Sequence, residues 1–389
     1  MKLLFCLIDM NLGGTEKSFL NLIATLPTDY EIDLILLQKE GELLHELPQK
    51  VHVIEDLSSI DIYKYTQASP LQLIKYYAKN RKMIKAAKGL WSYARYKFTG
   101  NGEYIFKIFD SEIPVGKKTY DIAIAYAGPH NFISYFVGKK VKAVKKINWI
   151  HFDVSEIVFD LKTSSNLYAY FDEIKVVSKI AQQNFIKLLP AFRSKTTVFS
   201  NILNVKDIKQ LSTEKEGGFK DNFNGVRILT VGRLTTQKGH DFALPAIRKL
   251  VENGYNLRYY ILGSGVQEKD LKKQVRDLNL DDFTIFLGSK KNPYPFMLQT
   301  DIYLQPSRHE GEGITVLEAK VFHKPIVVTN YTVAYDTIQD GITGLIVEMN
   351  SNAIFEGLRE LIDNKSLQRK FKENLMREQQ QIKNSILPF

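Results

Sequence analysis

Short apolar runs of strand length alternate along the chain with longer stretches in which apolar residues recur at helical spacing. In the first half, the runs predict strands at residues 3–8, 32–37, 51–54, 121–126, 147–150, 173–177 and 196–199. The stretches predict helices at residues 17–26, 71–98 and 179–188. Strands that alternate with helices are typical of a parallel sheet, so the first half predicts one α/β domain.

A polar segment at residues 204–225 interrupts this pattern, which then restarts. Further strands are expected at residues 227–231, 257–262, 283–287, 302–305, 325–329 and 344–347, with helices at 240–251, 314–322 and 367–382. A chain of 389 residues is also too long for one ordinary core. We therefore expect two doubly wound, Rossmann-like domains at residues 1–205 and 206–370, which would face each other across a cleft.

The composition excludes several classes of protein. One cysteine, Cys6, rules out a disulfide framework and favours a reducing compartment. The sequence has no apolar run of about 18 residues that would predict a transmembrane helix, and Asp9 stops the first run without a signal-peptide cleavage site. Cys/His clusters, an Asp-x-Asp pattern and a Walker loop are absent, so no metal site is indicated. We expect a cytoplasmic protein.

A glycine-containing loop near the C-terminal end carries the strongest candidate chemistry. It follows an expected strand, contains Gly311 and Gly313, and precedes a helix that is expected to begin at Ile314. Free backbone N–H groups and the helix dipole make such a loop suitable for phosphate. Glu310 and Glu318 bracket the loop, eight residues apart. Carboxylates beside an anion site indicate a ligand with hydroxyl groups as well, such as a sugar.

The loop at residues 232–239 also follows a strand and carries two cations, Arg233 and Lys238. A guanidinium can bind two phosphate oxygens and an ammonium adds a point charge, so a diphosphate is the simplest ligand for this pair. The alternative is two solvated loop cations.

Four residues of the first half are weaker candidates. Gly13 and Gly14 lie between the first strand and the first helix, where they either form a turn with positive φ or let a ligand approach the helix N-terminus. His151 ends an expected strand, and a lone histidine is most often structural. Asp153 could orient His151 or cap the next segment.

Taken in order, these motifs resemble those of the retaining glycosyltransferases of family four. Glu310 and Glu318 have the E-x7-E spacing of that family, and residues 232–239 look like its diphosphate loop. Residues 13–16 look like its N-terminal glycine loop, residues 340–345 like its late turn-and-strand element, and His151 matches a histidine near the transferred sugar. The likeness covers the second half well and the first half only at the glycine loop and His151.

The resemblance implies a GT-B fold in which the second domain binds the donor and the first binds the acceptor. A C-terminal helix at residues 371–389 is expected to pack back on the first domain. The implied activity is a retaining, metal-independent transfer of the hexosyltransferase type, without a cofactor, from a nucleotide sugar that is most often a UDP-sugar. The acceptor would be a glycan or a lipid-linked molecule in surface polysaccharide or glycolipid synthesis.

The resemblance also assigns roles by position. Arg233 and Lys238 would hold the donor diphosphate and neutralise the leaving group, Glu310 would contact sugar hydroxyls and Glu318 the ribose hydroxyls. His151 would lie near the transferred sugar. The remaining donor contacts would be Gly14, where the chain can approach phosphate or acceptor, and the backbone N–H groups of Gly313, Ile314 and Thr315.

Glu312 departs from the family, which commonly has an aromatic or apolar residue there. This carboxylate could alter the choice of donor sugar or point to solvent. Two rival functions stay open: a non-catalytic GT-B-like partner or chaperone of another transferase, and a nucleotide-sugar epimerase. The presence of Glu310 and Glu318 with Arg233 and Lys238 argues against the first rival.

The net charge of +10 belongs largely to one segment, because nine cations and no acidic residue lie between Asp61 and Glu103. Between Lys75 and Lys97 these cations are mixed with tyrosine and tryptophan. The segment could be a solvated helix face, a nucleic-acid site or a contact with an anionic membrane. We favour a peripheral contact on the inner face of the cell membrane, because the family often acts on lipid-linked acceptors, and we expect no nucleic acid.

Overall fold

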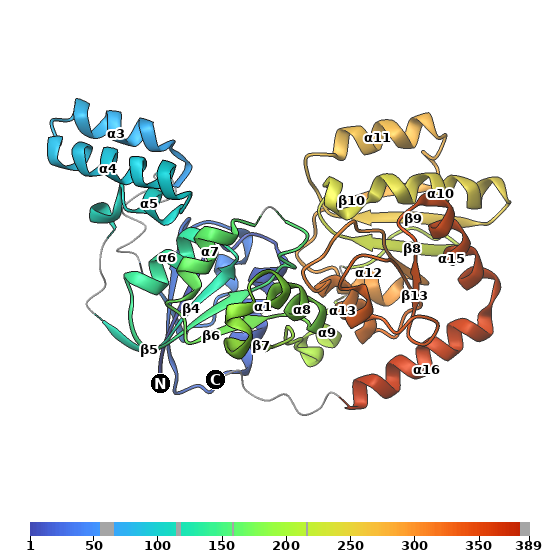
Figure 1. Cartoon of the computed structure of the whole chain (residues 1–389). Coiled ribbons are helices and arrows are strands. Elements are labelled where there is room, and N and C mark those ends of the chain that lie inside the picture. The colour runs from blue at the N-terminus through green and yellow to red at the C-terminus, as the bar shows by residue number, and fades with distance from the viewer. Residues whose placement is uncertain (55–65, 114–117, 158, 215–216, 382–389) are drawn as a thin grey trace. The chain divides into compact units, whose positions relative to one another are not determined.

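The computed structural model describes residues 1–54, 66–113, 118–157, 159–214 and 217–381. The chain divides into two compact units, Met1–Ser200 and Asn201–Phe389. The predicted domain boundary after residue 205 lies five residues from this division. Each unit is a parallel sheet with helices on its faces, so the predicted two-domain α/β fold is confirmed (Figure 1).

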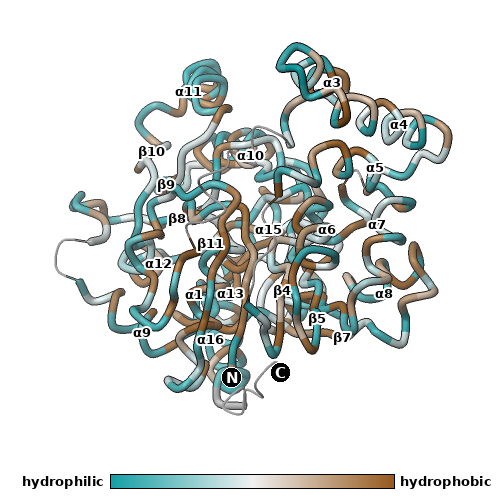
Figure 2. Tube along the Cα trace, turned by 90° about the vertical axis from the view of Figure 1, so that its left-hand side faces the viewer, coloured by the Kyte–Doolittle hydropathy of each residue, from teal (hydrophilic) through white to brown (hydrophobic). Residues whose placement is uncertain are grey.

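The described residues of the first unit form a seven-stranded parallel sheet in the order β3-β2-β1-β4-β5-β6-β7. The strands are β1 (Lys2–Leu7), β2 (Glu31–Leu36), β3 (Val51–Val53), β4 (Thr119–Gly128), β5 (Lys142–Ile150), β6 (Glu173–Val176) and β7 (Thr196–Val198). All seven overlap the strands that the apolar runs predict. Strands of a parallel sheet are buried on both faces, which explains why they are nearly continuous apolar runs (Figure 2).

The helices of the first unit cover the sheet and form one additional hairpin. They are α1 (Gly14–Thr25), α3 (Pro70–Lys79), α4 (Met83–Thr99), α5 (Glu103–Phe106), α6 (Asn131–Lys139), α7 (Leu161–Tyr168) and α8 (Lys179–Leu188), with short 3₁₀ turns η1 (Glu42–Glu46), η2 (Asp110–Glu112) and η3 (Pro190–Lys195). The single helix predicted at residues 71–98 is wrong. It is two helices, because Arg81 has a φ of 58° and the chain reverses there.

The described residues of the second unit form a six-stranded sheet in the order β10-β9-β8-β11-β12-β13. The strands are β8 (Val226–Val231), β9 (Leu257–Leu262), β10 (Thr284–Gly288), β11 (Ile302–Gln305), β12 (Ile326–Thr329) and β13 (Leu345–Val347). Again each overlaps a predicted strand. Between β8 and β11 the strand order reverses, and the carboxyl ends of strands at such a switch point are where ligands bind in open α/β sheets.

Two apolar clusters cover the faces of this second sheet. One is built largely from α10 (His240–Glu252) and α15 (Ser351–Asp363), the other from α12 (Tyr294–Gln299) and α13 (Ile314–Val321). The remaining elements are α9 (Val205–Leu211), η4 (Thr236–Lys238), α11 (Glu268–Asp277), α14 (Ala334–Thr337) and α16 (Lys365–Gln381). The polar segment at 204–225 therefore contains a helix, α9, whose Ile208 is buried in the second unit.

The C-terminal helix α16 packs within the second unit over its described length. Glu378 accepts a hydrogen bond from Lys320 of α13 at 2.7 Å, and Gln379 lies 2.9 Å from the ring of His323. The last residues of the predicted C-terminal helix, 382–389, lie outside the described residues. Its return to the first domain stays a prediction.

Candidate functional site

The switch point of the second unit brings the two predicted loops into direct contact. The loop after β8 ends at Gly239, which has a φ of 65°, a conformation that favours glycine. A Cβ atom at Gly239 would lie 1.9 Å from the carbonyl oxygen of Pro306, in the loop after β11. Glycine is therefore required at this position both by its backbone conformation and by the close approach of the second loop.

Arg308 joins the two loops through hydrogen bonds, although no local sequence pattern singles it out. Its guanidinium donates two hydrogen bonds to the carboxylate of Asp241, at 2.8 and 2.7 Å, and a third to the carbonyl of Thr236, at 2.7 Å. Its backbone N–H donates to the carbonyl of Gln237 at 2.7 Å. A two-point contact of this kind fixes orientation as well as distance, so Arg308 positions the loop that carries Arg233 and Lys238.

Glu310 and Lys238 form an ion pair at the centre of the site. Nζ of Lys238 lies 2.7 and 2.9 Å from the two carboxylate oxygens of Glu310. Ser307 Oγ and Gln305 Nε2 donate to the same carboxylate, at 2.6 and 3.0 Å. Glu310 is only 8% exposed, so these donors compensate the burial of its charge. The residue predicted for the sugar and one predicted for the diphosphate are thus held as one unit.

Arg233 is exposed at the edge of the same loop. Its Nη2 lies 3.5 Å from Gln237 Oε1, which is a long contact, so the guanidinium can turn towards a ligand. Its carbonyl oxygen lies 3.3 Å from Nε2 of the buried His240. Burial lowers the pKa of His240 to about 4, so this ring is neutral near pH 7 and acts as a fixed support of the loop.

The start of α13 supplies the predicted anion site. Gly313 is its N-cap with a φ of 77°, and no side chain caps this helix end. The amides of Val316 and Leu317 bond to the carbonyl of Gly313, at 2.8 and 3.1 Å. The N–H groups of Gly313, Ile314 and Thr315 precede these bonds and lie at the positive end of the helix dipole. This geometry suits phosphate, and the contact itself stays a prediction.

Glu318 lies one turn further into α13 and is fully buried. Its Oε1 accepts a hydrogen bond from the hydroxyl of Tyr294 on α12, at 2.9 Å. Tyr294 is a partner that sequence reasoning missed. Because protein atoms cover the Glu318 carboxylate in this structure, its predicted contact with ribose stays a prediction.

Glu312 does not point to solvent, so that alternative is wrong. Its side chain is 7% exposed, and its Oε2 accepts hydrogen bonds from the backbone N–H and from Nδ2 of Asn201, at 2.9 and 2.5 Å. Its carbonyl accepts a hydrogen bond from Thr337 at 3.1 Å. Asn201 is the first residue of the second unit. Glu312 therefore ties the chain segment that enters this unit to the candidate loop.

The glycines of the first unit do not form the turn that one alternative required. Gly13 is the N-cap of α1 with an extended conformation, φ −138° and ψ 166°, and Gly14 is the first residue of the helix. A Cβ atom at Gly13 would lie 2.1 Å from Oε2 of Glu16, so the absent side chain leaves space for a carboxylate beside the helix start. The approach of phosphate or acceptor to Gly14 stays a prediction.

His151 follows β5 directly and is buried between aromatic rings. It stacks on Trp149, with ring centroids 6.0 Å apart and planes 4° apart, and its centroid lies 4.4 Å from that of Tyr126. Burial lowers the pKa of His151 to about 3, so the imidazole is neutral near pH 7. Within the described residues, neither ring nitrogen has a side-chain hydrogen-bonding partner.

Asp153 caps the next segment and does not orient His151. Its Oδ1 accepts hydrogen bonds from the backbone N–H and the hydroxyl of Ser155, at 2.9 and 2.7 Å. Its Oδ2 accepts a hydrogen bond from Asn184 at 2.8 Å.

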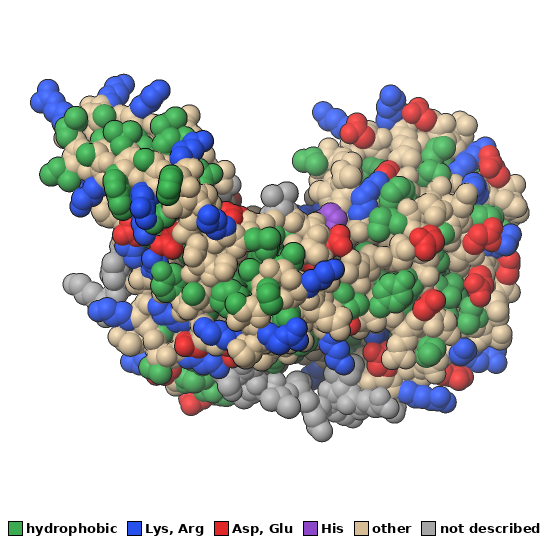
Figure 3. Space-filling view, viewed as in Figure 1, with side chains coloured by type: hydrophobic (Ala, Val, Ile, Leu, Met, Phe, Trp, Pro, Cys, Tyr) green, Lys and Arg blue, Asp and Glu red, His purple; other side chains and the backbone are tan. Residues whose placement is uncertain are grey.

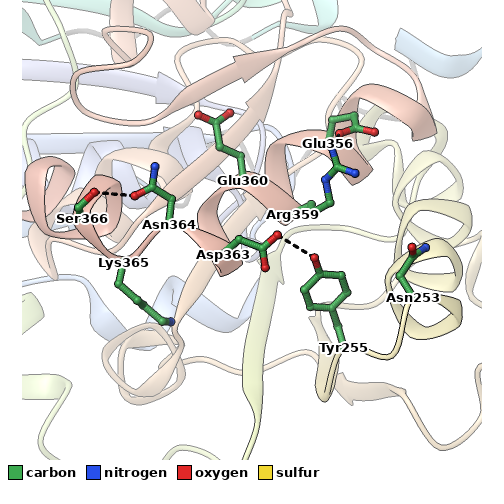
Figure 4. Close-up of a pocket in the computed structure, with 9 residues that line it drawn as sticks. All are labelled: Asn253, Tyr255, Glu356, Arg359, Glu360, Asp363, Asn364, Lys365 and Ser366. Atoms are coloured by element: carbon green, nitrogen blue, oxygen red, sulfur yellow. Dashed lines mark hydrogen bonds and ion pairs between the residues drawn. The ribbon is translucent and has the colours of Figure 1, made fainter.

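A separate surface hollow of about 970 Å³ lies beside the segment that precedes β9, at the amino ends of the strands. The candidate loops instead follow the carboxyl ends of β8 and β11. Figure 4 shows the lining of the hollow, in which the hydroxyl of Tyr255 donates to Asp363 at 2.8 Å. The described lining residues include none of the predicted site residues: Asn253, Tyr255, Glu356, Arg359, Glu360, Asp363, Asn364, Lys365 and Ser366. In the described part of the chain, no cluster of three His, Cys, Asp or Glu side chains could hold a metal ion.

Known proteins match this chain in sequence and in fold. Residues 215–377 match the model of the family described as glycosyl transferases group 1. The chain is 25% identical over 365 residues to the N-acetylgalactosamine-N,N'-diacetylbacillosaminyl-diphospho-undecaprenol 4-alpha-N-acetylgalactosaminyltransferase of Campylobacter jejuni, covering 92% of this chain and 90% of the relative. It is 28% identical over 194 residues to the capsular polysaccharide biosynthesis glycosyltransferase CapM of Staphylococcus aureus, covering 49% of this chain and 50% of that protein.

A solved structure shares the fold over nearly the whole length. The crystal structure of Anabaena HepE in complex with UDP and glucose aligns with a TM-score of 0.69 and 18% identity, covering 98% of this chain and 95% of HepE. Residues 215–377, which lie in the second unit, thus resemble the glycosyl transferases group 1, and the chain as a whole has the GT-B fold.

Proposed function

We propose that this protein is a glycosyltransferase that moves a sugar from a nucleotide-sugar donor to a glycan or lipid-linked acceptor in surface polysaccharide or glycolipid synthesis. The observation that carries the proposal is the contact between the two switch-point loops of the second unit, which holds Lys238 and Glu310 as a buried pair beside the N-terminus of α13. The match of residues 215–377 to the group 1 model and the names of both relatives support it.

The donor diphosphate would lie between the start of α13 and the cations of the β8 loop. Departure of the nucleoside diphosphate builds negative charge on its terminal phosphate, and fixed donors that meet this charge lower the barrier without a metal. The exposed guanidinium of Arg233 can turn to the phosphate oxygens. Lys238 carries three N–H donors, so it can contact phosphate while it stays paired with Glu310.

Glu310 would accept hydrogen bonds from hydroxyls of the transferred sugar, and its position is fixed by Ser307 and Gln305. The neutral ring of His151 would contribute a hydrogen bond to the sugar from the first unit. Since none of these residues is an activated covalent nucleophile, we propose a same-face reaction in which the leaving phosphate takes the acceptor proton and the anomeric configuration is retained.

We propose UDP as the nucleotide, with its ribose near Glu318 and Tyr294. HepE was solved with UDP, which supports this choice. The Campylobacter relative is named for a diphospho-undecaprenol-linked acceptor, which supports a lipid-linked acceptor here. Such an acceptor lies at a membrane, and we propose that the basic hairpin of α3 and α4 meets an anionic membrane surface. Within the described residues, no helix is both long and apolar enough to cross a membrane.

A panel of nucleotide sugars tests the function. Thermal-shift measurements should identify a stabilising donor, and NMR of the reaction should show slow release of the nucleoside diphosphate with retention at the anomeric carbon. The Lys238→Gln variant should lose this turnover, and Lys273→Gln, which alters an exposed lysine of α11, is the matched control. Epimerised sugar would favour an epimerase, and the absence of binding to any donor would favour a non-catalytic partner.

A further inference from the structure

Helix α4 has apolar side chains on its solvent-facing side as well as on its packed side. Its buried residues are small, and Gly89 lies so close to α3 that a Cβ atom there would be 2.9 Å from Cγ1 of Ile74. On the other side Ile84, Trp91 and Phe98 are 74%, 60% and 88% exposed. Their spacing of seven residues places them in one row along the helix. Trp91 meets the ring of Tyr104 edge to face, with centroids 6.3 Å apart. Most of the surface of the three side chains nevertheless stays exposed.

A second exposed row widens the apolar surface. Met83 and Leu90 are 64% and 54% exposed and are also seven residues apart. The exposed alanines Ala87 and Ala94 lie between the two rows. Together the rows form a continuous apolar band along a helix of 17 residues, which we call the α4 band. Exposed apolar surface of this extent marks a site of contact with another surface.

Basic side chains border the α4 band. By helical position, the exposed Lys88 and Arg95 lie on one edge and the exposed Lys97 on the other. The guanidinium of Arg95 lies 5.6 Å from the ring centroid of Trp91, which joins the cationic edge to the apolar row. Lys85 is excluded from this edge because it pairs with Glu112 at 2.6 Å. Figure 3 shows basic and apolar side chains together over the hairpin.

We propose that the α4 band inserts into the interface of an anionic lipid membrane. The helix would lie parallel to the membrane plane, with Ile84, Trp91 and Phe98 among the upper acyl chains. Lys88, Arg95 and Lys97 have apolar stems long enough to reach back to the headgroup phosphates. This inference rests on the membrane contact proposed above and assigns it to one face of one helix.

A second copy of the chain is the other occupant to consider, and the charge disfavours it. No acidic residue lies between Asp61 and Glu103, so two α4 bands packed together would bring cation against cation. An anionic membrane instead provides charge of the opposite sign. Each basic residue near its surface should strengthen binding to the membrane roughly fivefold, which corresponds to about 1 kcal/mol.

Trp91 provides an internal reporter, because the chain has two tryptophans and the other, Trp149, is buried. The full-length protein is mixed with vesicles of phosphatidylcholine containing phosphatidylglycerol, and with vesicles of phosphatidylcholine alone. We expect a blue shift of the tryptophan emission and cosedimentation with the anionic vesicles. The Ile84→Ser, Trp91→Phe and Phe98→Ser variants, combined, should bind roughly a hundredfold more weakly.

Val144→Ser is the matched control, since Val144 is an apolar residue of the same unit that is 82% exposed and lies outside α4. It should bind like the unchanged protein. Phe98→Ser alone, at the most exposed position of the band, gives a second test if the combined variant does not fold, and it should weaken binding by about tenfold.

Equal cosedimentation of all variants, or no emission shift with anionic vesicles, would overturn the inference. A dimer in solution that the combined variant converts to a monomer, without vesicle binding, would assign the band to a second copy. Vesicle binding does not require turnover, whereas release of nucleoside diphosphate in solution does not require vesicles. Failure of the membrane contact and failure of the proposed transfer are therefore separate results.

Discussion

Glu310 and Lys238, which are 72 residues apart in sequence, form one ion pair with Nζ–Oε distances of 2.7 and 2.9 Å. The pair joins the loop after β8 to the loop after β11 at the point where the strand order of the second sheet reverses. Each loop carries part of the site that the sequence predicts. Because the pair joins the two loops, a change of either residue should affect both loops.

Glu310→Gln should remove turnover because it abolishes the charge that orients Lys238, whose side chain is only 12% exposed. We expect a fall in kcat of at least about a hundredfold, and a loss of stability of about 1–3 kcal/mol, because a partly buried ammonium loses its partner. Steady-state kinetics and urea unfolding measure the two effects. Glu373→Gln, an exposed position on α16, is the control and should change neither.

The kcat of the double variant Glu310→Gln with Lys238→Gln should be no lower than that of the less active single variant, because the two residues act as a unit. Losses of kcat that multiply would contradict this coupling.

Arg308→Lys should raise the KM for the donor by about tenfold while the protein stays folded, because lysine cannot make the two-point contact with Asp241 and also hold the carbonyl of Thr236. The loop that carries Arg233 and Lys238 would then be less well placed. Arg276→Lys, an exposed position on α11, is the matched control. An unchanged KM in Arg308→Lys would show that the loop is fixed by other contacts.

Glu312→Gln should lower stability by about 1–2 kcal/mol, since a charged acceptor of two hydrogen bonds from Asn201 becomes a neutral one. We expect the order of preference among donor sugars to stay unchanged, because the described contacts of Glu312 are with the protein. Competition between nucleotide sugars measures this order. A changed order would favour the alternative in which Glu312 selects the sugar.

The burial of His151 should make the stability of the protein depend on pH. Its pKa is lowered by burial to about 3 from 6.5, so below pH 6.5 the unfolded chain binds a proton that the folded protein does not. This contribution to stability is complete above the unfolded pKa and is lost progressively as the pH falls towards the folded pKa. Between about pH 7.5 and 5 it should cost about 2 kcal/mol.

His151→Gln should reduce this loss, which urea unfolding of both proteins at the two pH values would measure. His240, with a pKa lowered to about 4, should act in the same direction, so His240→Gln provides an independent comparison. If His151→Gln and the unchanged protein lost the same amount of stability between the two pH values, the ring would not be buried and neutral as described.

The strands could be predicted from the sequence because parallel strands buried on both faces must be apolar throughout. The break between α3 and α4 could not, because helical spacing continues through residues 80–82 while the backbone turns at Arg81. The helix α9 within the polar segment was missed for a different reason: few of its residues are buried, so it has no clear apolar spacing.

At the site, the loops and their charged residues could be identified from spacing, but their partners could not. Asp241 lies 67 residues from Arg308, and Asn201 lies 111 residues from Glu312. Only the folded sheet brings these side chains together, so neither the support given by Arg308 nor the burial of Glu312 has a local sequence signal. Tyr294 reaches Glu318 from another helix in the same way.

A structure determined with bound UDP would show where the nucleotide binds and would therefore test the proposed donor site. We predict that the diphosphate lies at the N-terminus of α13, in contact with the amides of Gly313 to Thr315 and with Arg233, and that Lys238 stays paired with Glu310. UDP bound elsewhere, such as in the hollow beside Tyr255, with the candidate loops unoccupied, would show that these loops are not the donor site.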